Sequence, residues 1–378
     1  MPAPMLDVNR QNQPLREEVL AAIVEVMDTG AFVNGPACKR FEAAAAEYCG
    51  VEHAVGCASG TDALLLALMA VGVGPGDEVI IPSFTFFATA GSVSRLGAKP
   101  VFADLIPATF NIDPADIEQK ITANTRAIIP VHLFGQTAHM GAINDLAAKH
   151  QLPVIEDAAQ AIGGEFQGKR AGSLGTIGCF SFYPTKNLGG MGDGGLVTTN
   201  DADLAAKIRV LCDHGQSPRY HHHLVGLNSR LDAMQAAALD IKLKHLDSYA
   251  AGRQRHAARY ADELAEAMGV ITPVEAAGCT SVWNQYTVRV EGGRRDELQK
   301  FLGEQKIGSA IYYPIPLHLQ ACFAELGYGP GDLPHTEQAA EEVLSLPVFP
   351  ELAAEEQADV ISAIQQFSAA GGSVAEAA

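Results

Sequence analysis

The sequence predicts an α/β fold, in which a large domain with a mainly parallel sheet precedes a smaller C-terminal α+β domain. Three observations predict it. Short apolar strand candidates alternate with helical patterns through the first two thirds of the chain, this rhythm changes after about residue 205, and a length of 378 residues suits two domains. We expect seven strands that are buried on both faces, because they are continuously apolar rather than alternating.

The expected elements follow in chain order. A helix over Leu15–Met27 has apolar residues on one stripe, and Gly30 follows its end. Helical patterns at Asp62–Ala70 and Ala142–His150 lie among the strands. The seven expected strands are Ala54–Cys57, Glu78–Ile81, Pro100–Ala103, Ala127–Val131, Val154–Glu156, Gly178–Phe182 and Leu196–Thr199.

The C-terminal third begins with two long helical stretches. After them we expect a strand, a helix and two further elements. We place the domain boundary in the helical region, which gives a large domain of residues 1–247, including an N-terminal arm of residues 1–13, and a small domain of residues 248–378. The expected elements of this part are Leu231–Leu246, Tyr249–Met268, Tyr286–Val290, Arg294–Gln305, Ala339–Leu344 and Glu355–Phe367.

The formal net charge of −18 argues against nucleic acid or an anionic membrane surface as a partner, since both attract basic proteins. The charge is unevenly distributed: residues 307–378 contain ten acidic residues and no Lys or Arg, whereas residues 163–259 contain twelve basic and eight acidic residues. A phosphorylated ligand is therefore compatible with that central region. Seven cysteines without a C-x-x-C pair favour free thiols in the cytoplasm over disulfides or a zinc site.

Two membrane signals are also missing from the sequence. The N-terminal stretch has no apolar core of the signal-peptide kind, and the longest apolar run, Ala63–Gly74, is shorter than the about 20 residues that span a bilayer. We therefore expect a cytoplasmic protein that does not bind membranes.

Ligands of open α/β sheets bind beyond the carboxyl ends of the strands, and unusual residues stand at those ends. Asp157 comes directly after the expected strand Val154–Glu156. The simpler interpretation of this acidic residue is that it caps the N-terminus of the next helix. Lys186 follows another strand, in a segment with no other charge and many glycines. A surface lysine is the commoner case, but a lysine held in apolar surroundings would have a lowered pKa and be a usable nucleophile.

A third feature is Ser59-Gly60-Thr61-Asp62, which opens a helix. Backbone N–H groups at a helix start can bind an anion, and simple capping explains the same residues. The chain has no P-loop or G-x-S-x-G motif, and its one G-x-G-x-x-G match, at residues 190–195, leads into an expected strand and does not open a helix. The signatures of dinucleotide-binding, P-loop and α/β-hydrolase proteins are therefore absent. An anion site, a strand-end carboxylate and an isolated lysine are together what pyridoxal phosphate needs.

Five motifs, taken together and in this order along the chain, resemble the DegT/DnrJ/EryC1/StrS family of sugar-nucleotide aminotransferases. They are CASGTDAL, IPSFTFFAT, VIEDAAQA, SFYPTKNLGG-x-GDGG and VGLNSRLDAMQAAAL. The resemblance implies a fold-type I pyridoxal-phosphate transferase, like aspartate aminotransferase, with a seven-stranded sheet. It runs from about residue 6 to residue 367.

The resemblance also assigns roles to the residues of the cofactor site. Lys186 would bind the cofactor covalently and then move protons, Asp157 would pair with the ring nitrogen, and Gln160 would hydrogen-bond the phenolic oxygen. Phe86 would stack on the ring, although ordinary core packing is the alternative for any one Phe. The phosphate would be held by Gly60, Thr61 and Ser181.

The resemblance implies further contacts from more distant segments. Asn228 would reach the phosphate of a neighbouring subunit, which implies a homodimer with active sites at the interface. Tyr313 and His318 would lie on the substrate side, although incidental polar residues in a proline-rich loop are a serious alternative. Adjacent histidines 221–223 do not share one face, so we expect a solvated loop and no metal site.

The substrates follow from the same resemblance. Glutamate would donate the amino group, giving 2-oxoglutarate, and a nucleotide-linked keto-sugar would accept it. The closest likeness is to UDP-2-acetamido-2-deoxy-3-oxo-glucuronate aminotransferases of O-antigen and surface-polysaccharide synthesis, in which Arg230 would face the uronate carboxylate. Tyr312 departs from that pattern, where those enzymes tend to carry His. The alternatives are a dTDP-3-keto- or 4-keto-6-deoxyhexose aminotransferase, a pyridoxamine-dependent sugar dehydratase, against which Lys186 counts, and a non-catalytic or regulatory protein of this fold.

Overall fold

The computed structural model describes residues 3–375, and residues 1–2 of the expected arm and 376–378 of the expected small domain lie outside the described residues. All seven expected strands are present, each within a few residues of its predicted bounds. They are β1 (His53–Cys57), β2 (Glu78–Pro82), β3 (Lys99–Ala103), β4 (Thr125–Ile128), β5 (Ile155–Asp157), β8 (Ile177–Ser181) and β9 (Gly195–Thr199).

These strands form one mainly parallel sheet. Two hydrogen-bonded groups, β1-β9-β8-β5 and β3-β2-β4, are joined by the parallel bridges Ile128–Val154 and Val131–Asp157. The order across the sheet is therefore β1-β9-β8-β5-β4-β2-β3. Strand β9 runs antiparallel to both of its neighbours, and the other pairs are parallel. The predicted fold class is confirmed.

Both faces of the sheet are covered, as the continuously apolar strands predict. Cys179 and Val197 belong to a buried cluster with α4, whereas their neighbours Phe180 and Leu196 belong to a second cluster with α3 and α9. Successive side chains thus point to opposite faces, each against helices. The helices around the sheet are α3 (Pro36–Cys49), α4 (Gly60–Ala70), α5 (Phe87–Arg95), α6 (Pro114–Lys120), α7 (Met140–His150), α8 (Ala202–Cys212) and α9 (Ala233–Leu243).

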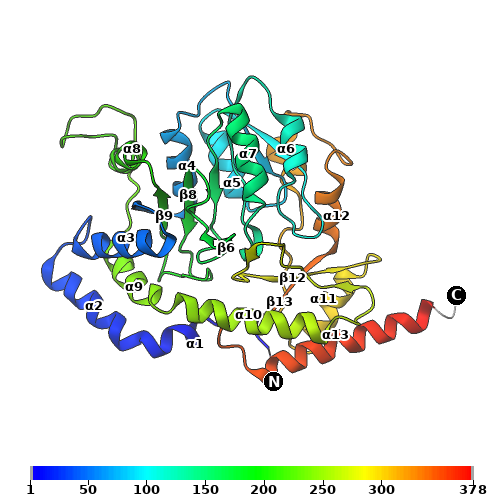
Figure 1. Ribbon diagram of the computed structural model, residues 1–378. Helices are drawn as coiled ribbons and strands as arrows, with labels where there is room; N and C mark the ends of the chain where they lie inside the picture. Colours follow the sequence, from blue (N-terminus) through cyan, green and yellow to red (C-terminus); the bar gives the residue numbers. More distant parts are fainter. Residues whose placement is uncertain (1–2, 376–378) are drawn as a thin grey trace.

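The C-terminal part has its own antiparallel sheet, ordered β10-β12-β13. In Figure 1 the long helix α10 runs along the lower side of the molecule. Helix α13 extends away from the body of the molecule toward the C-terminus. Since α10 begins at Leu246, the proposed boundary between residues 247 and 248 falls in its first turn; the division itself stays a prediction. The elements are α10 (Leu246–Glu263), β10 (Val270–Ile271), β12 (Tyr286–Val290), α11 (Arg295–Glu304), α12 (Pro334–Glu342), β13 (Val343–Leu346) and α13 (Ala354–Ala375).

The N-terminal segment and the segment after α11 each contact parts of the chain that are distant in sequence. Ala3 forms a parallel bridge with Ile307, and the helices α1 (Val8–Asn12) and α2 (Arg16–Thr29) follow. After α11 the chain returns to the large sheet, where Leu317 and Phe323 join the buried cluster of α4. This return brings the loop that precedes Leu317 to the carboxyl ends of the strands.

Two details differ from the expectations. The expected element Ala339–Leu344 straddles the end of α12 and the start of β13. The small sheet β11 (Cys279–Thr280), β6 (Glu165–Phe166) and β7 (Lys169–Arg170) was not anticipated, because two-residue strands leave no periodic pattern. Within residues 3–375, no helix is long and apolar enough to cross a membrane, and no group of three or more His, Cys, Asp or Glu residues could hold a metal ion. All seven cysteines are free thiols.

Candidate active site

The candidate site lies where three parallel strands end. Asp157 is the last residue of β5, Ser181 is the last residue of β8, and β1 leads through a short turn to Gly60 at the start of α4. Carboxyl ends of parallel strands lie along one edge of a sheet, so these residues are brought to the same edge. Lys186 follows β8 in the next turn.

Lys186 is held in a tight turn. Its backbone N–H donates to the carbonyl of Tyr183 at 2.8 Å. A side chain at Gly189 would place its Cβ 2.3 Å from the carbonyl oxygen of Pro184, so the turn requires glycine there. Burial of the Lys186 amine lowers its pKa from 10.5 to about 8, against the opposing attraction of Asp157. About a tenth of this amine is therefore neutral and nucleophilic at pH 7, far more than for an ordinary lysine.

Asp157 is a buried carboxylate with two donors. The Thr89 hydroxyl donates to Oδ2 at 2.8 Å, and the N–H of Ala159 donates to Oδ1 at 3.3 Å. Burial raises the pKa of Asp157, whereas these two hydrogen bonds and the charge of Lys186 lower it. The net result is a raised pKa, and the two donors offset part of the cost of a buried carboxylate at the end of the strand, where a cationic ring nitrogen can pair with it.

Gln160 and Tyr313 meet beside this carboxylate. The N–H of Phe134 donates to Oε1 of Gln160 at 2.7 Å, and Nε2 of Gln160 donates to the Tyr313 hydroxyl at 3.4 Å. Burial raises the pKa of Tyr313, so its hydroxyl stays protonated. The structure thus brings two predicted residues, 153 positions apart, into contact.

Phe86 is a large aromatic side chain that is exposed to solvent beside Tyr313. It is 59% exposed, and its ring centroid lies 6.3 Å from that of Tyr313. It stands immediately before α5, as the N-cap residue. An exposed ring beside buried polar groups can stack on a planar ligand, and packing in the core does not explain its exposure.

Gly60, Thr61 and Ser181 form a narrow cradle. A Cβ on Gly60 would lie 2.6 Å from Cβ of Ser181, so the start of α4 and the end of β8 approach as closely as glycine allows. The first N–H groups of a helix have no partner within the helix, and the Ser59 hydroxyl already accepts from Asp62. The N–H groups of Gly60 and Thr61 and the Ser181 hydroxyl therefore surround a site suited to phosphate.

His318 is locked into the protein. Its Nδ1 lies 2.7 Å from the Ser83 hydroxyl, its Nε2 lies 3.2 Å from the Glu337 carboxylate, and its side chain is buried. Because a carboxylate only accepts, Nε2–H donates to Glu337 and Ser83 donates to Nδ1. Both ring nitrogens are engaged, so in this structure neither is free for a substrate, and the substrate contact stays a prediction.

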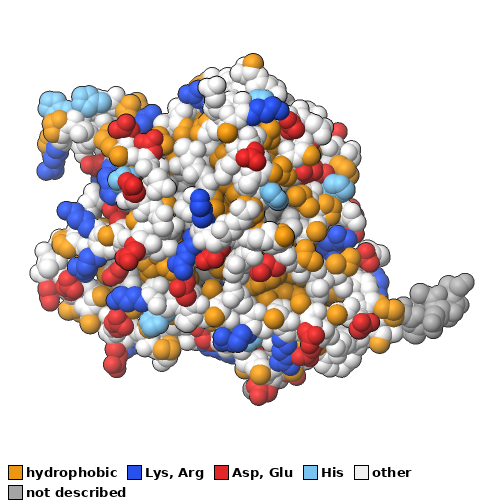
Figure 2. All heavy atoms as spheres, in the orientation of Figure 1, with side chains coloured by type: hydrophobic (Ala, Val, Ile, Leu, Met, Phe, Trp, Pro, Cys, Tyr) orange, Lys and Arg blue, Asp and Glu red, His pale blue; other side chains and the backbone are white. Residues whose placement is uncertain are grey.

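Asn228 and Arg230 flank Ser229, which contacts the start of α4. Asn228 is exposed, while the next residue, Ser229, is buried and donates to Asp62 of α4 at 2.7 Å. Arg230 donates to Asp213 at 2.5 Å and lines a surface cavity of about 310 Å³. The loop between them and α8 projects from the body and carries several histidines and one arginine, Arg219 (Figures 1 and 2).

Two contacts in the site were not foreseen from the sequence. Thr89 holds Asp157, and the backbone of Phe134, with a left-handed φ of 58°, holds Gln160. The threonine three residues after Phe86 was a possible signal, since that spacing puts both residues on one helical turn. Nothing in the sequence around Phe134 announces its contact, which depends on how the chain passes from β4 to the next helix.

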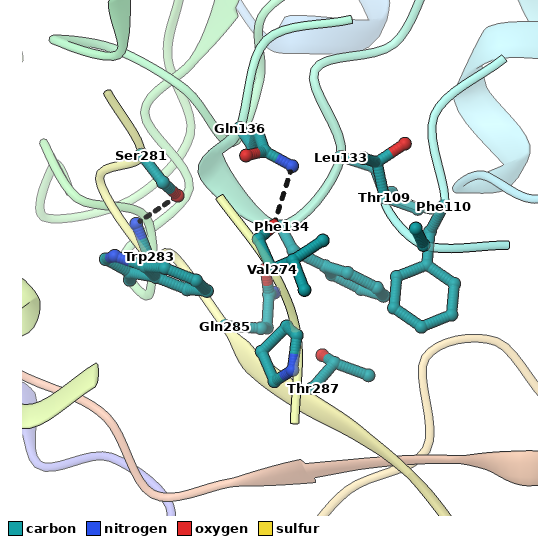
Figure 3. Close-up of a pocket in the computed structure, with 12 residues that line it drawn as sticks. Thr109, Phe110, Leu133, Phe134, Gln136, Val274, Ser281, Trp283, Gln285 and Thr287 are labelled. Atoms are coloured by element: carbon teal, nitrogen blue, oxygen red, sulfur yellow. Dashed lines mark hydrogen bonds between the residues drawn. The ribbon is translucent and has the colours of Figure 1, made fainter. Parts of the chain in front are cut away.

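A separate pocket lies beside the Phe134 loop and is drawn in Figure 3. Phe110 and Phe134 line one side, and Trp283 and Thr287 line the other. The N–H of Gln285 donates to the carbonyl of Phe134 at 3.3 Å. None of the residues that line this pocket is a predicted site residue, so it marks a contact between the two parts of the chain rather than the cofactor site.

The geometry supports one kind of chemistry. A lysine of lowered pKa, a buried carboxylate, an amide and an anion cradle surround one edge of the sheet, with an exposed aromatic ring beside them. These groups fit pyridoxal phosphate. The amine can react with its aldehyde, the carboxylate can pair with its ring nitrogen, and the cradle can bind its phosphate.

Comparisons with known proteins agree with this geometry. The family model of the DegT/DnrJ/EryC1/StrS aminotransferases matches residues 13–365. The chain is 54% identical to a pleiotropic regulatory protein of Geobacillus stearothermophilus, covering 97% of this chain and 99% of that one. It is 48% identical to the UDP-N-acetyl-3-dehydro-alpha-D-glucosamine 3-aminotransferase of Acidithiobacillus ferrooxidans, covering 96% and 97%.

A solved structure gives the same answer. The crystal structure of DesV from S. venezuelae, in complex with a ketimine intermediate, has a TM-score of 0.95 and 45% sequence identity, covering 97% of this chain and 98% of that one. The enzymes of this family depend on pyridoxal phosphate. The chain therefore belongs to the DegT/DnrJ/EryC1/StrS aminotransferase family and is a pyridoxal-phosphate-dependent sugar-nucleotide transaminase.

Proposed function

We propose that this transaminase transfers the amino group of glutamate to carbon 3 of a nucleotide-linked keto-sugar in surface-polysaccharide or amino-sugar biosynthesis. The observation that carries the chemistry is that Lys186, whose pKa is about 8, lies close enough to the buried Asp157 to feel its charge. The choice of a 3-keto sugar is supported by the named activity of the Acidithiobacillus relative and by the resemblance of the segment around Asn228 and Arg230.

Each residue has a definable task in this proposal. When bound, pyridoxal phosphate supplies an electron sink for the amino transfer. Asp157 keeps a proton on the ring nitrogen, Gln160 and Tyr313 orient the phenolic side, and Phe86 covers the ring face. The amine of Lys186 would serve as the base that takes a proton from the substrate carbon and later gives a proton back, which requires the neutral form that burial favours.

We also propose that the enzyme is a homodimer, in which Asn228 completes the partner's phosphate site. Two features support this. Asn228 is exposed, and helix α2 exposes Leu20, Val24 and Met27, one stripe of apolar side chains that are 44–59% exposed. A solvent-facing apolar stripe is suited to contact with a second copy.

Subunit mixing tests the shared site. Asn228→Ala and Lys186→Ala are expected to be weakly active or inactive alone. When the two are refolded or co-expressed as mixed dimers, one site per dimer regains both wild-type residues, so activity should return. If mixed dimers stay as inactive as the parents, Asn228 acts within its own chain and the proposal of a shared site is wrong.

A substrate panel tests the position of amination. Purified enzyme, 2-oxoglutarate and nucleotide-linked amino sugars are mixed, and formation of glutamate is measured. We expect turnover of 3-amino sugars and at least about tenfold less with 4-amino sugars. Preferred turnover of 4-amino sugars would overturn the proposal. No turnover of any sugar by protein that holds the cofactor would favour a regulatory role, as the name of the Geobacillus relative suggests for that protein.

The positive charge of Arg230 bears on whether the acceptor sugar is a uronate or a neutral sugar. A free guanidinium would suit the carboxylate of UDP-2-acetamido-2-deoxy-3-oxo-glucuronate. The short contact with Asp213 favours the second candidate, a neutral 3-keto sugar, because Arg230 is already paired. Arg230→Ala should raise KM selectively for the uronate if that is the substrate, and should affect uronate and neutral sugars equally if it is not.

The cytoplasm remains our proposed location for this protein.

A further inference from the structure

Two threonine hydroxyls lie behind the carboxylate of Asp157. The Thr89 hydroxyl is 2.8 Å from Oδ2 of Asp157, and the Thr85 hydroxyl is 3.1 Å from that of Thr89. All three side chains are buried, with exposed fractions of 5% for Asp157, 0% for Thr89 and 2% for Thr85. A buried row of two hydroxyls that ends on a carboxylate is therefore present at the site.

The direction of donation along this row is fixed by chemistry. An ionised carboxylate only accepts, so the hydroxyl proton of Thr89 is committed to Asp157. Thr89 can then only accept from Thr85, whose hydroxyl donates. Hydrogen bonds in such a row strengthen one another in buried surroundings, and donors to a carboxylate stabilise its ionised form.

The threonines are not needed to cap their own helix. Thr89 stands in the first turn of α5, and that helix has Phe86 as its N-cap and no side-chain capping bond. The Thr89 side chain instead reaches a residue 68 positions away. Phe86 and Thr89 are three residues apart, so one helical turn carries both the exposed ring and the hydroxyl that holds Asp157.

We propose that Thr89, supported by Thr85, is a positioning residue that keeps Asp157 ionised and aimed at the ring nitrogen of the cofactor. The inference rests on the proposed role of Asp157 as the partner of that nitrogen. Without the two hydroxyls, the buried carboxylate takes up a proton more readily, and the ring nitrogen keeps less of its positive charge.

The visible absorbance of the holoenzyme reports this charge. The absorbance changes when the nitrogen that joins Lys186 to the cofactor takes up a proton, and a positive charge on the ring opposes that uptake. Thr89→Val preserves the shape of the side chain and removes the hydroxyl, so the midpoint of the absorbance titration should rise by about one pH unit. Thr89→Ser should restore it, and Thr85→Val should cause a smaller rise.

A matched control removes an equivalent hydroxyl elsewhere. Thr287 is buried in the C-terminal sheet and its hydroxyl lies 2.8 Å from that of Ser345. Thr287→Val should leave the midpoint unchanged, which separates loss of a buried hydrogen bond from loss of this one.

Asp157→Asn distinguishes failure of the inference from failure of the proposed function. If Asp157→Asn moves the midpoint but neither Thr89→Val nor Thr85→Val does, the positioning role is wrong and the role of Asp157 stands. If Asp157→Asn leaves the midpoint where it is, the proposed pairing with the ring nitrogen is wrong. Should Thr89→Val fail to fold, Thr85→Val alone decides, and an unchanged midpoint in that variant overturns the inference.

Discussion

Replacing Lys186 by methionine is expected to stabilise the cofactor-free protein. Burial lowers the pKa of Lys186 from 10.5 to about 8, which means that the folded state holds the charged amine less favourably than the unfolded chain does. The difference of 2.5 pH units corresponds to about 3 kcal/mol at 1.36 kcal/mol per unit. Because Lys186 is partly exposed, water reduces this cost, and we expect a gain of about 1–3 kcal/mol in Lys186→Met.

The gain depends on pH with a definite sign. Below about pH 8 both states are protonated and the full cost of the buried charge is present. As the pH rises from about 8 toward 10.5, the folded state releases its proton while the unfolded chain keeps it, so the wild-type protein becomes more stable. The advantage of Lys186→Met should therefore shrink through this window.

Urea unfolding of the two apoproteins at equal concentration, at about pH 7 and about pH 9.5, measures the difference. Lys300→Met is the matched control, because Lys300 is exposed on α11 and its loss should leave the free energy of unfolding nearly unchanged. If Lys186→Met is no more stable than the wild type at about pH 7, or if its advantage does not depend on pH, the amine is not held in a desolvated place and the reasoning is wrong.

Three further predictions concern individual contacts. Asp157→Asn should lower kcat by about 100-fold or more while the protein still binds the cofactor, since a buried charge partner is removed; kcat within about twofold of wild type would contradict this. Gly60→Ala places a Cβ 2.6 Å from Cβ of Ser181 and should weaken cofactor binding at least about tenfold in equilibrium dialysis, whereas unchanged affinity would show that the cradle is not used. His318→Gln breaks contacts to Ser83 and Glu337 and should cost about 1–3 kcal/mol of stability in urea unfolding, and a rise in KM for the nucleotide sugar at unchanged stability would instead favour direct substrate contact.

The large domain could be predicted from the sequence because its strands are short, apolar and separated by helices. In that domain the strand ends at Asp157 and Ser181 were located within a residue or two. In the C-terminal part, the expected strand Tyr286–Val290 matches β12 residue for residue. Elements without a periodic pattern were not predictable. The two-residue strands around Phe166 are set by pairing between distant segments, and the strand β13 follows α12 without any turn signal.

The candidate site divides in a similar way. Lys186, Asp157 and Gln160 follow strands directly, so local sequence and the geometry of parallel sheets placed them together. Tyr313 reaches Gln160 only because the chain returns to the sheet after α11. Thr89 was missed because its one local signal, the three-residue spacing from Phe86, does not indicate which distant carboxylate it contacts.

The central claim is that Lys186 carries the cofactor. Reduction of the purified holoenzyme with borohydride, followed by digestion and mass spectrometry, locates the lysine to which the pyridoxyl group is bound. We expect the added mass on the peptide that contains Lys186, and we expect it to be lost in Lys186→Ala. Modification of a different lysine, or a modified peptide that persists in Lys186→Ala, would contradict it.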